Sequence, residues 1–323
     1  MSTALDNPPT GADPTSPHPA YAPIVIKGLV KRFGTFPALD GLDLRVESGR
    51  VHGFLGPNGS GKSTTMRTLL GLYHANSGTV RVLGQDPRTD SSAINTKVAY
   101  VPGDVSFWPN LTGGQVLDVL AGLRGARDRE REGELVDRFA LDPTRRVRTC
   151  SKGNRQKVAL VAALSAPVDL LLLDEPTSGL DPLMEEVFAD CIVEAAAAGR
   201  TVLLSSHVLG EVERLCSHLT IIKDGRTVES GSLVDLRSVS ASRVAFRCAA
   251  TVGASLTGRL RALGLAPEVT QVASEEVRVS AHVPRPSVPE ALLLLAQHDV
   301  TDISCTPATL EDLFLRHYET RPR

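Results

Sequence analysis

The segment from Gly56 to Ser63 reads G-P-N-G-S-G-K-S, which fits the spacing G-x-x-x-x-G-K-[ST]. Glycines at these places let the backbone turn tightly, so that its N–H groups converge on phosphate oxygens. Lys62 would reach the β and γ phosphates of a nucleotide, and the Ser63 hydroxyl would ligate Mg²⁺. The pattern predicts a loop that binds a nucleoside triphosphate; the alternative is a glycine turn with a structural role only. The expected contacts are Gly56, Pro57, Asn58, Gly59, Ser60, Gly61, Lys62, Ser63 and Thr64.

A pair of acidic residues, Asp174 and Glu175, follows the leucine run at 170–173. A buried strand that ends in two carboxylates brings negative charge to the carboxyl edge of a sheet, beside the phosphate loop. We expect Asp174 to hold Mg²⁺, directly or through water, and Glu175 to orient and polarise the water that attacks the γ phosphate. Without the phosphate loop, such a pair is better explained as the cap of the next helix.

The elements around these residues have the order that such a site needs. Residues 50–55 read as a short buried strand before the phosphate loop, and 64–72 have apolar residues at helical spacing. Strands and helices then alternate at 169–173, 183–198, 201–205 and 208–216, and Asp224-Gly225 indicates a closing hairpin within 219–229. This alternation predicts an α/β fold with a mainly parallel sheet. Further strands are expected at 24–30, 42–46, 79–83 and 98–101, and further helices at 114–123 and 130–139.

The character of the chain changes twice. Residues 1–22 are rich in Pro, Ser and Thr and are expected to be a disordered leader. From residue 240 the patterns predict strands at 243–248, 268–272, 276–283 and 300–305, with helices at 255–263, 288–297 and 308–318. We therefore expect a P-loop NTPase domain over 23–239, with a helical subdomain at about 104–165, and a small α+β, ferredoxin-like accessory domain over 240–323.

Composition excludes several classes of function. The formal net charge is −2 and no basic run occurs, which argues against binding to nucleic acid. The five cysteines are far apart and lack metal-ligand spacing, so a reducing compartment is expected. No apolar run approaches the roughly 20 residues that span a bilayer, so we expect any role at a membrane to depend on a partner protein.

Three further segments complete a resemblance. Residues 151–157 open a helix upstream of Asp174, residues 176–181 read P-T-S-G-L-D, and His207 follows the strand at 201–205. With these segments the chain resembles the ATP-binding subunits of ABC transporters. The resemblance implies ATP and Mg²⁺ as ligands and ATP hydrolysis as the reaction. It also implies a head-to-tail pair of identical or different ATPase subunits, in which the signature of one covers the γ phosphate held by the other.

The resemblance also assigns roles to single residues. Ser151, Gly153 and Asn154 lie in the signature, where a small donor at a helix N-terminus suits an anion, although Ser151 is equally explained as a helix cap. Asp181 belongs to the D-loop, residues 176–181, which links the two sites. His207 matches the switch histidine that contacts the γ phosphate, and Phe33 matches the aromatic residue that stacks on adenine.

Two departures from the family pattern stand out. After Tyr-x-Pro the family has Gln, whereas this chain has Gly103 and then Asp104, so we expect Asp104 to supply the missing oxygen to Mg²⁺. The alternative is that this contact is lost. The signature has Cys150, Lys152 and Asn154 where Leu, Gly and Gln are usual, while its serine and second glycine remain.

The C-terminal part ends in L-E-D-L-F-L-R-H-Y at 310–318 and resembles drug- and antibiotic-exporting members of the daunorubicin-resistance type. This resemblance implies export of a hydrophobic compound through a separate multi-spanning permease, at the cytoplasmic face of the plasma membrane. The resemblance places Phe107 and Trp108 in the segment that contacts the permease in that family. The alternative is that Trp108 packs inside the protein. Two other interpretations remain: a soluble ABC-type ATPase that acts on ribosomes or DNA, and a nucleotide sensor without turnover.

Overall fold

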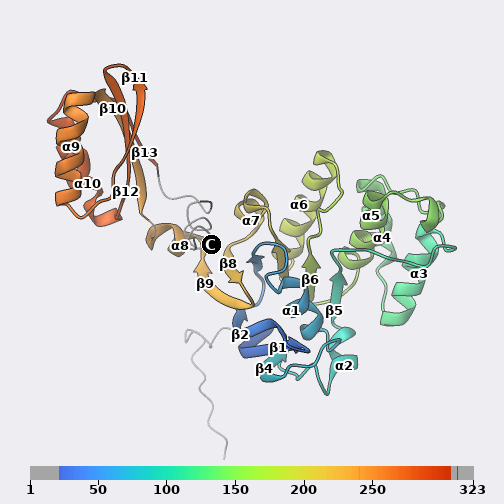
Figure 1. Ribbon diagram of the computed structural model, residues 1–323. Helices are drawn as coiled ribbons and strands as arrows, with labels where there is room; N and C mark the ends of the chain where they lie inside the picture. The colour runs from blue at the N-terminus through green and yellow to red at the C-terminus, as the bar shows by residue number, and fades with distance from the viewer. Residues whose placement is uncertain (1–21, 240, 307–310, 312–323) are drawn as a thin grey trace, which may run out of the picture.

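The computed structural model describes residues 22–239, 241–306 and 311 of the 323-residue chain. The described strands form three sheets, of six, four and three strands. Figure 1 shows the six-stranded and three-stranded sheets together at the centre, a group of helices on one side, and the four-stranded sheet on the other. The phosphate loop and the acidic pair both lie at strand ends of the six-stranded sheet.

The six-stranded sheet has the order β5-β6-β7-β3-β8-β9. Its members are β3 (Val51–Leu55), β5 (Val98–Val101), β6 (Leu170–Asp174), β7 (Thr201–Ser206), β8 (His218–Lys223) and β9 (Arg226–Ser232). All neighbours pair in parallel except β8 and β9, which form the antiparallel hairpin predicted at Asp224 and Gly225. Both turn residues have positive φ, as a tight hairpin requires. The predicted mainly parallel sheet is confirmed.

The run of leucines in β6 is explained by burial on both faces of this sheet. Leu171 and Leu173 belong to one core cluster, and Leu170 and Leu172 belong to the cluster on the opposite face. All four are fully buried. Because side chains alternate along a strand, a central parallel strand with helices on both faces needs a continuous apolar sequence. The two cores hold the end of β6, and therefore the acidic pair, in a fixed position.

The three-stranded sheet has the order β2-β1-β4, with β1 (Ile24–Phe33), β2 (Phe36–Val46) and β4 (Ser77–Val82). The strands predicted at 24–30 and 42–46 are both longer than expected, because β1 continues to Phe33 and β2 begins at Phe36. Phe33 pairs directly with Phe36 across a short turn at residues 34 and 35. Pairing with β2 supplies the backbone hydrogen bonds that this part of β1 needs, whereas its exposed polar residues concealed the strand pattern.

The described helices of the first part of the chain include all those predicted and two more. They are α1 (Lys62–Leu69), α2 (Ser91–Asn95), α3 (Gly113–Arg124), α4 (Arg129–Arg138), α5 (Lys152–Leu164), α6 (Pro182–Ala197), α7 (Leu209–Leu215) and α8 (Leu233–Val239), with a 3-10 turn, η1 (Val147–Thr149). The short helices α2 and α8 were not predicted, since one or two turns are too few to display a helical period. Helices α3, α4 and α5 lie together at the side of the molecule (Figure 1).

The C-terminal sheet has the order β11-β12-β10-β13, and its neighbours pair antiparallel. It comprises β10 (Ser242–Ala249), α9 (Ala250–Ala262), β11 (Glu268–Ala273), β12 (Glu276–Val283), η2 (Arg285–Ser287), α10 (Val288–Ala296) and β13 (Thr301–Thr306). The predicted βαββαβ order is confirmed, and α9 and α10 share one apolar core with the sheet. The helix predicted at 308–318 lies outside the described residues except for residue 311, and the leader predicted at 1–22 lies outside them except for residue 22. The proposed domain boundaries stay predictions.

Candidate nucleotide-binding and active site

The phosphate loop runs from β3, whose five residues are all buried, into α1. Gly61 is the residue before α1 and has φ of +111°, which L side chains rarely adopt. A Cβ on Gly61 would also stand 2.6 Å from Leu39 Cδ2, and one on Gly56 would stand 2.5 Å from the carbonyl oxygen of Ile222. Close packing therefore requires glycine at both positions, and conformation requires it at Gly61 as well. The predicted strand, loop and helix context is confirmed.

Lys62 lies inside the loop with only 4% of its surface exposed. Its Nζ donates to the carbonyl oxygens of Gly56 at 2.7 Å and Pro57 at 3.2 Å, and it lies 3.5 Å from Oε1 of Glu175. Burial lowers the pKa of Lys62, and the negative charge of Glu175 opposes this shift. The loop thus presents a cation next to a carboxylate at the N-terminus of α1, where phosphate charge is favoured.

The two carboxylates of the acidic pair point to different partners because the backbone turns sharply between them. Asp174 is 1% exposed, and its Oδ1 accepts a hydrogen bond of 2.5 Å from the hydroxyl of Ser205. Glu175 has φ of +48°, an unusual value for a residue other than glycine, and its N–H donates to the carbonyl oxygen of Ser205 at 3.1 Å. Such strained residues cluster at functional sites. The turn leaves Asp174 buried and directs Glu175 toward Lys62.

His207 lies on the other side of Glu175. Its Nδ1 is 3.3 Å from the same Oε1 atom that faces Lys62, and its side chain is 49% exposed. The structure therefore brings together three of the predicted residues, Lys62, Glu175 and His207, around one carboxylate oxygen. This oxygen can accept a proton from a water that is held between the carboxylate and the imidazole.

Ser205 was missed by sequence reasoning. It is fully buried at the end of β7, where it pairs in register with Asp174, and it fixes both the carboxylate of Asp174 and the backbone of Glu175. The signal in the sequence that could have indicated a role for Ser205 was its position two residues before His207, at the end of a predicted strand. A lone serine at the end of an apolar strand is not distinctive unless the order of the strands is known.

A cavity of about 270 Å³ lies over the phosphate loop. It is lined by Phe33, Phe36, Ala38, Asn58, Gly59, Gly61, Lys62, Ser63, Thr64 and Glu175. Phe33, 44% exposed, packs edge-on against Tyr73 with ring centroids 5.2 Å apart, and Lys31 Nζ lies 5.0 Å from its centroid. Phe36 was missed by sequence reasoning and is 63% exposed. The cavity therefore joins a polar phosphate end to an aromatic end that suits a purine.

The metal ligands proposed from the sequence are not all brought together. Gly103, at the position of the missing Gln, lies against Asp174, because a Cβ on Gly103 would stand 3.7 Å from its carboxylate oxygen Oδ2. Asp104 is exposed. No group of three or more His, Cys, Asp or Glu side chains that could hold a metal ion occurs among the described residues. One carboxylate and one hydroxyl, from Asp174 and Ser63, still fit Mg²⁺, which is usually held by few protein ligands together with the phosphates of its nucleotide. The role of Asp104 stays a prediction.

The signature and the D-loop lie away from this cavity and contact each other. Ser151 caps α5 by accepting from the N–H of Asn154 at 3.2 Å, and Asp181 caps α6 by accepting from Met184 at 3.0 Å. The cavity over the phosphate loop of the same chain is lined by none of the predicted signature and D-loop residues, which are Ser151, Gly153, Asn154 and Asp181. The capping role predicted for Ser151 is therefore confirmed, the cap at Asp181 was not predicted, and the contact of these residues with a nucleotide stays a prediction.

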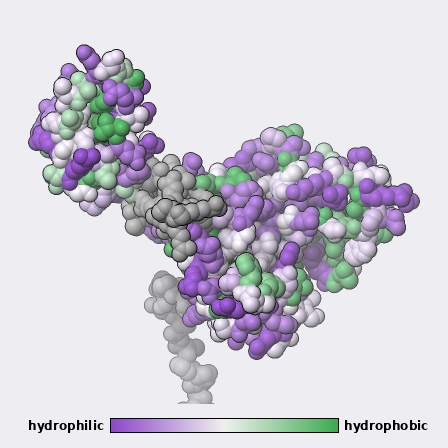
Figure 2. All heavy atoms as spheres, in the orientation of Figure 1, coloured by the Kyte–Doolittle hydropathy of each residue, from purple (hydrophilic) through white to green (hydrophobic). Residues whose placement is uncertain are grey.

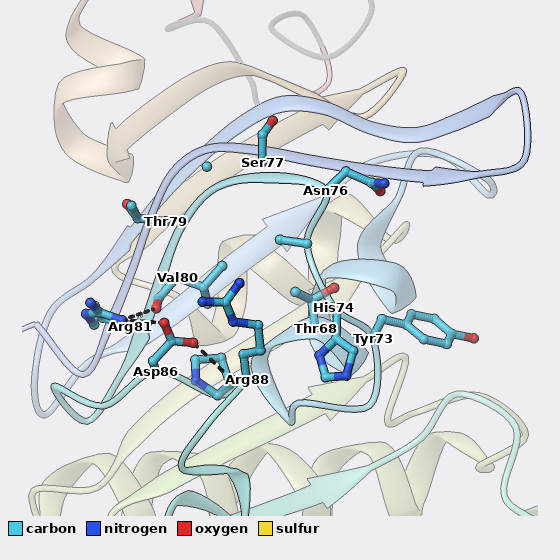
Figure 3. A pocket seen from close by; sticks show the side chains of 13 residues that line it. Thr68, Tyr73, His74, Asn76, Ser77, Thr79, Val80, Arg81, Asp86 and Arg88 are labelled. Carbon is cyan, nitrogen blue, oxygen red and sulfur yellow. Dashed lines mark hydrogen bonds and ion pairs between the residues drawn. The ribbon is translucent and has the colours of Figure 1, made fainter.

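A second hollow, of about 230 Å³, lies between β4 and the segment after α1 (Figure 3). Its walls include Tyr73, His74 and Arg88, and Arg81 forms an ion pair with Asp86 at its edge. None of the predicted site residues lines this hollow.

In the view of Figure 2, hydrophilic residues cover most of the visible face, and hydrophobic residues form small separate patches. No helix among the described residues has the length and apolarity needed to cross a bilayer.

Comparison with known proteins agrees with this geometry. Residues 39–178 match the family described as "ABC transporter". The chain is 36% identical over 274 residues to the daunorubicin/doxorubicin resistance ATP-binding protein DrrA of Streptomyces peucetius, and the match covers 83% of this chain and 79% of that protein. The fold is similar to that of an ATP-binding subunit of an ABC transporter, with a TM-score of 0.63, 29% identity and coverage of 66% of this chain and 91% of the other. A dimeric bacterial ABC transporter cassette, MJ0796, has a TM-score of 0.60 and 24% identity, with 65% and 98% covered.

Proposed function

The chain belongs to the ATP-binding subunits of ABC transporters, and from this membership we propose that it powers the export of a hydrophobic, drug- or antibiotic-like compound through a separate membrane permease. As a member of this family it binds ATP and hydrolyses it, and hydrolysis is coupled to transport. The observation that carries the catalytic part is the position of Glu175 Oε1 between Lys62 Nζ and His207 Nδ1. The aromatic end of the cavity supports ATP as the nucleotide.

The reaction follows from the roles of these residues. A water held by Glu175 and His207 attacks the γ phosphorus, and Glu175 takes its proton as the new P–O bond forms. The bond to the bridging oxygen of ADP breaks on the opposite side, and the charge remains on ADP and phosphate. Lys62 stabilises the charge on the transferred group. Ser63 and Asp174 would hold Mg²⁺, which neutralises charge on the β and γ phosphates when it is bound.

We propose that two such subunits act head to tail. Ser151, which caps α5, is exposed, and Gly153 in the first turn of α5 is half-buried; neither lines the cavity over the phosphate loop of its own chain. Backbone N–H groups at a helix N-terminus suit the γ phosphate of a neighbouring subunit. The structure of the similar cassette MJ0796 is described as dimeric, which supports this proposal. The partner is either a second copy of the chain or a different ATPase subunit.

The contact with the permease is proposed for the segment before α3. Trp108 is 51% exposed, while Phe107 is partly buried against the core. An exposed tryptophan next to a buried anchor suits a partner helix, because such aromatic residues dominate the energy of many interfaces. This contact would hold the subunit at the cytoplasmic face of the plasma membrane. The similarity to a daunorubicin/doxorubicin resistance protein supports a hydrophobic substrate.

Capture of the partner tests this proposal. Tagged full-length chain carrying Glu175→Gln is recovered from gently solubilised native membranes in the presence of Mg²⁺ and ATP, and stoichiometric partners are identified by mass spectrometry. A multi-spanning permease is expected. The matched control is the Trp108→Ala variant of the same protein, which should recover less permease and still bind ATP. Recovery of ribosomes or DNA alone would instead support a soluble ATPase that acts on those assemblies.

A further inference from the structure

We propose that Glu211, in α7, is a positioning residue that links the D-loop to the switch histidine His207. The inference rests on the proposed function, since it assumes that His207 acts at the γ phosphate. Glu211 does not line the cavity over the phosphate loop, and it lies instead beside a separate cavity of about 250 Å³. That cavity is bordered by α6, α7, the D-loop residue Thr177 and the switch-loop residue Val208.

On the switch side, Glu211 holds the residue before His207. Oε2 of Glu211 accepts a hydrogen bond of 2.5 Å from the hydroxyl of Ser206, which is 2% exposed. The same hydroxyl oxygen accepts from the N–H of Val208 at 2.9 Å. Both neighbours of His207 are therefore tied to Glu211 through one buried hydroxyl. Because the imidazole itself is half exposed, these buried contacts are what set its direction toward Glu175.

On the other side, the D-loop is held at two points by α5. Nε2 of Gln156, a fully buried residue of α5, donates to the carbonyl oxygen of Pro176 at 2.8 Å. Lys152 Nζ donates to the hydroxyl of Ser178 at 2.7 Å. Thr177 lies between these two anchors and faces Glu211, where its side chain favours the ionised carboxylate. A displacement of α5 is thereby passed to Thr177.

The carboxyl group of Glu211 is incompletely paired. Its Oε1 is shielded from solvent and has no hydrogen-bond partner among the described residues. Burial raises the pKa of Glu211, and the nearby Glu185 adds to this shift, while Ser206, Thr177 and His207 oppose it. An unpaired buried acceptor is unfavourable, and the Thr177 hydroxyl is the D-loop donor that a small movement would bring onto Oε1. When the signature of the chain contacts a partner's nucleotide, the D-loop can therefore strengthen the hydrogen bonding of Glu211 to the segment from Ser206 to Val208.

Steady-state ATP turnover of the full chain tests the link. Glu211→Ala should lower kcat by about tenfold, the size expected for coupling between sites, without weakening ATP binding in a direct titration. Thr177→Val, which is nearly isosteric and leaves α7 intact, should lower kcat by roughly fivefold. Glu213→Ala, which removes an exposed carboxylate from the same helix, is the control and should leave turnover unchanged.

Double variants separate a link from a merely structural role. Adding Thr177→Val or His207→Ala to Glu211→Ala should cause no further loss beyond the more severe single variant, because all three residues then act along one path. If the losses in a double variant multiply, or if Glu211→Ala is fully active, the inference is overturned. The proposed function is unaffected by that result as long as His207→Ala is impaired. A fully active His207→Ala overturns both the inference and the proposed role of the histidine. Unfolding temperatures of all variants confirm that each is folded.

Discussion

Gly153 of α5 lies against the carbonyl oxygen of Gly179 in the D-loop, so closely that a Cβ on Gly153 would stand 2.4 Å from that oxygen. The sequence had suggested only that this glycine frees its N–H for a phosphate. The structure adds a packing reason, because no side chain fits between the signature helix and the D-loop. The signature and the D-loop must therefore move together.

Replacement of Gly153 by alanine should accordingly force the two segments apart. Overpacking of this kind typically costs about 1–3 kcal/mol of the free energy of unfolding, and we expect a loss in that range together with lower ATP turnover. Urea unfolding and an ATPase assay measure both. Gly133→Ala in α4, where nothing lies within 4 Å of the new Cβ, is the matched control and should stabilise the helix by about 0.5–1 kcal/mol. Equal effects at the two positions would contradict the packing argument.

Glu175→Gln should abolish most turnover and leave ATP binding intact. The amide keeps the size of the side chain and loses the group that accepts the proton of the attacking water, so kcat should fall by about 10²–10⁴-fold. Single-turnover hydrolysis and equilibrium titration with a fluorescent ATP analogue measure the two quantities. Glu130→Gln, at an exposed position of α4, should change neither. Turnover at the wild-type rate would remove Glu175 from its catalytic role.

Ser205→Ala should raise the Mg²⁺ concentration that half-maximal turnover requires. Ser205 fixes the carboxylate of Asp174 through a hydrogen bond of 2.5 Å, and loss of such a supporting contact typically weakens metal affinity by about 10–100-fold. A Mg²⁺ titration of the ATPase rate at fixed ATP measures the shift. Ser165→Ala removes another buried hydroxyl, one that donates to Val161, and should leave the titration unchanged. An unaltered titration for Ser205→Ala would show that Asp174 needs no such support.

Phe33→Ala should weaken ATP binding through loss of the stacking surface. Stacking of a base on an aromatic ring contributes about 1–3 kcal/mol, so the Kd for ATP should rise by roughly 5- to 150-fold. Isothermal titration of ATP and of inorganic triphosphate distinguishes the base from the phosphates, because only ATP binding should respond. Phe36→Ala is the comparison, since Phe36 lines the same cavity. An effect of Phe36→Ala alone would move the base contact to that residue.

His52 should make the protein less stable in acid. Burial lowers its pKa to about 3, and the adjacent His218 adds to this shift, whereas the ordinary value is 6.5. Below about pH 6.5 the unfolded chain therefore binds a proton at this position that the folded state refuses, so the free energy of unfolding falls as the pH drops from 6.5 toward 3. The slope approaches about 1.4 kcal/mol per pH unit from this group.

Urea unfolding at a series of pH values between 7 and 5 measures this slope. His52→Gln, which keeps a polar partner for Thr220, should show a shallower dependence than the wild type, while His74→Gln at an exposed position should match the wild type. Equal slopes for all three proteins would show that His52 binds its proton as readily in the folded state as in the unfolded chain.

The sequence by itself determined the family and the phosphate end of the site. Eight consecutive residues from Gly56 to Ser63 act as one local unit, and an apolar strand before Asp174 and Glu175 must bring its end to the same sheet edge. Such features depend on neighbours in the chain and on the period of a strand or helix, so they can be read without coordinates.

The tertiary structure decided which side chains meet. Ser205 is next to Asp174 because β7 lies beside β6, Phe36 faces the cavity because β1 extends into a hairpin, and Glu211 reaches the switch loop from α7. None of these contacts has a local sequence signature, since each depends on strand order, register or the packing of a helix. The sequence predicted the role of Glu175. The tertiary structure decides the left-handed backbone of Glu175, which directs its carboxylate between Lys62 and His207, because this backbone depends on the pairing of β6 with β7.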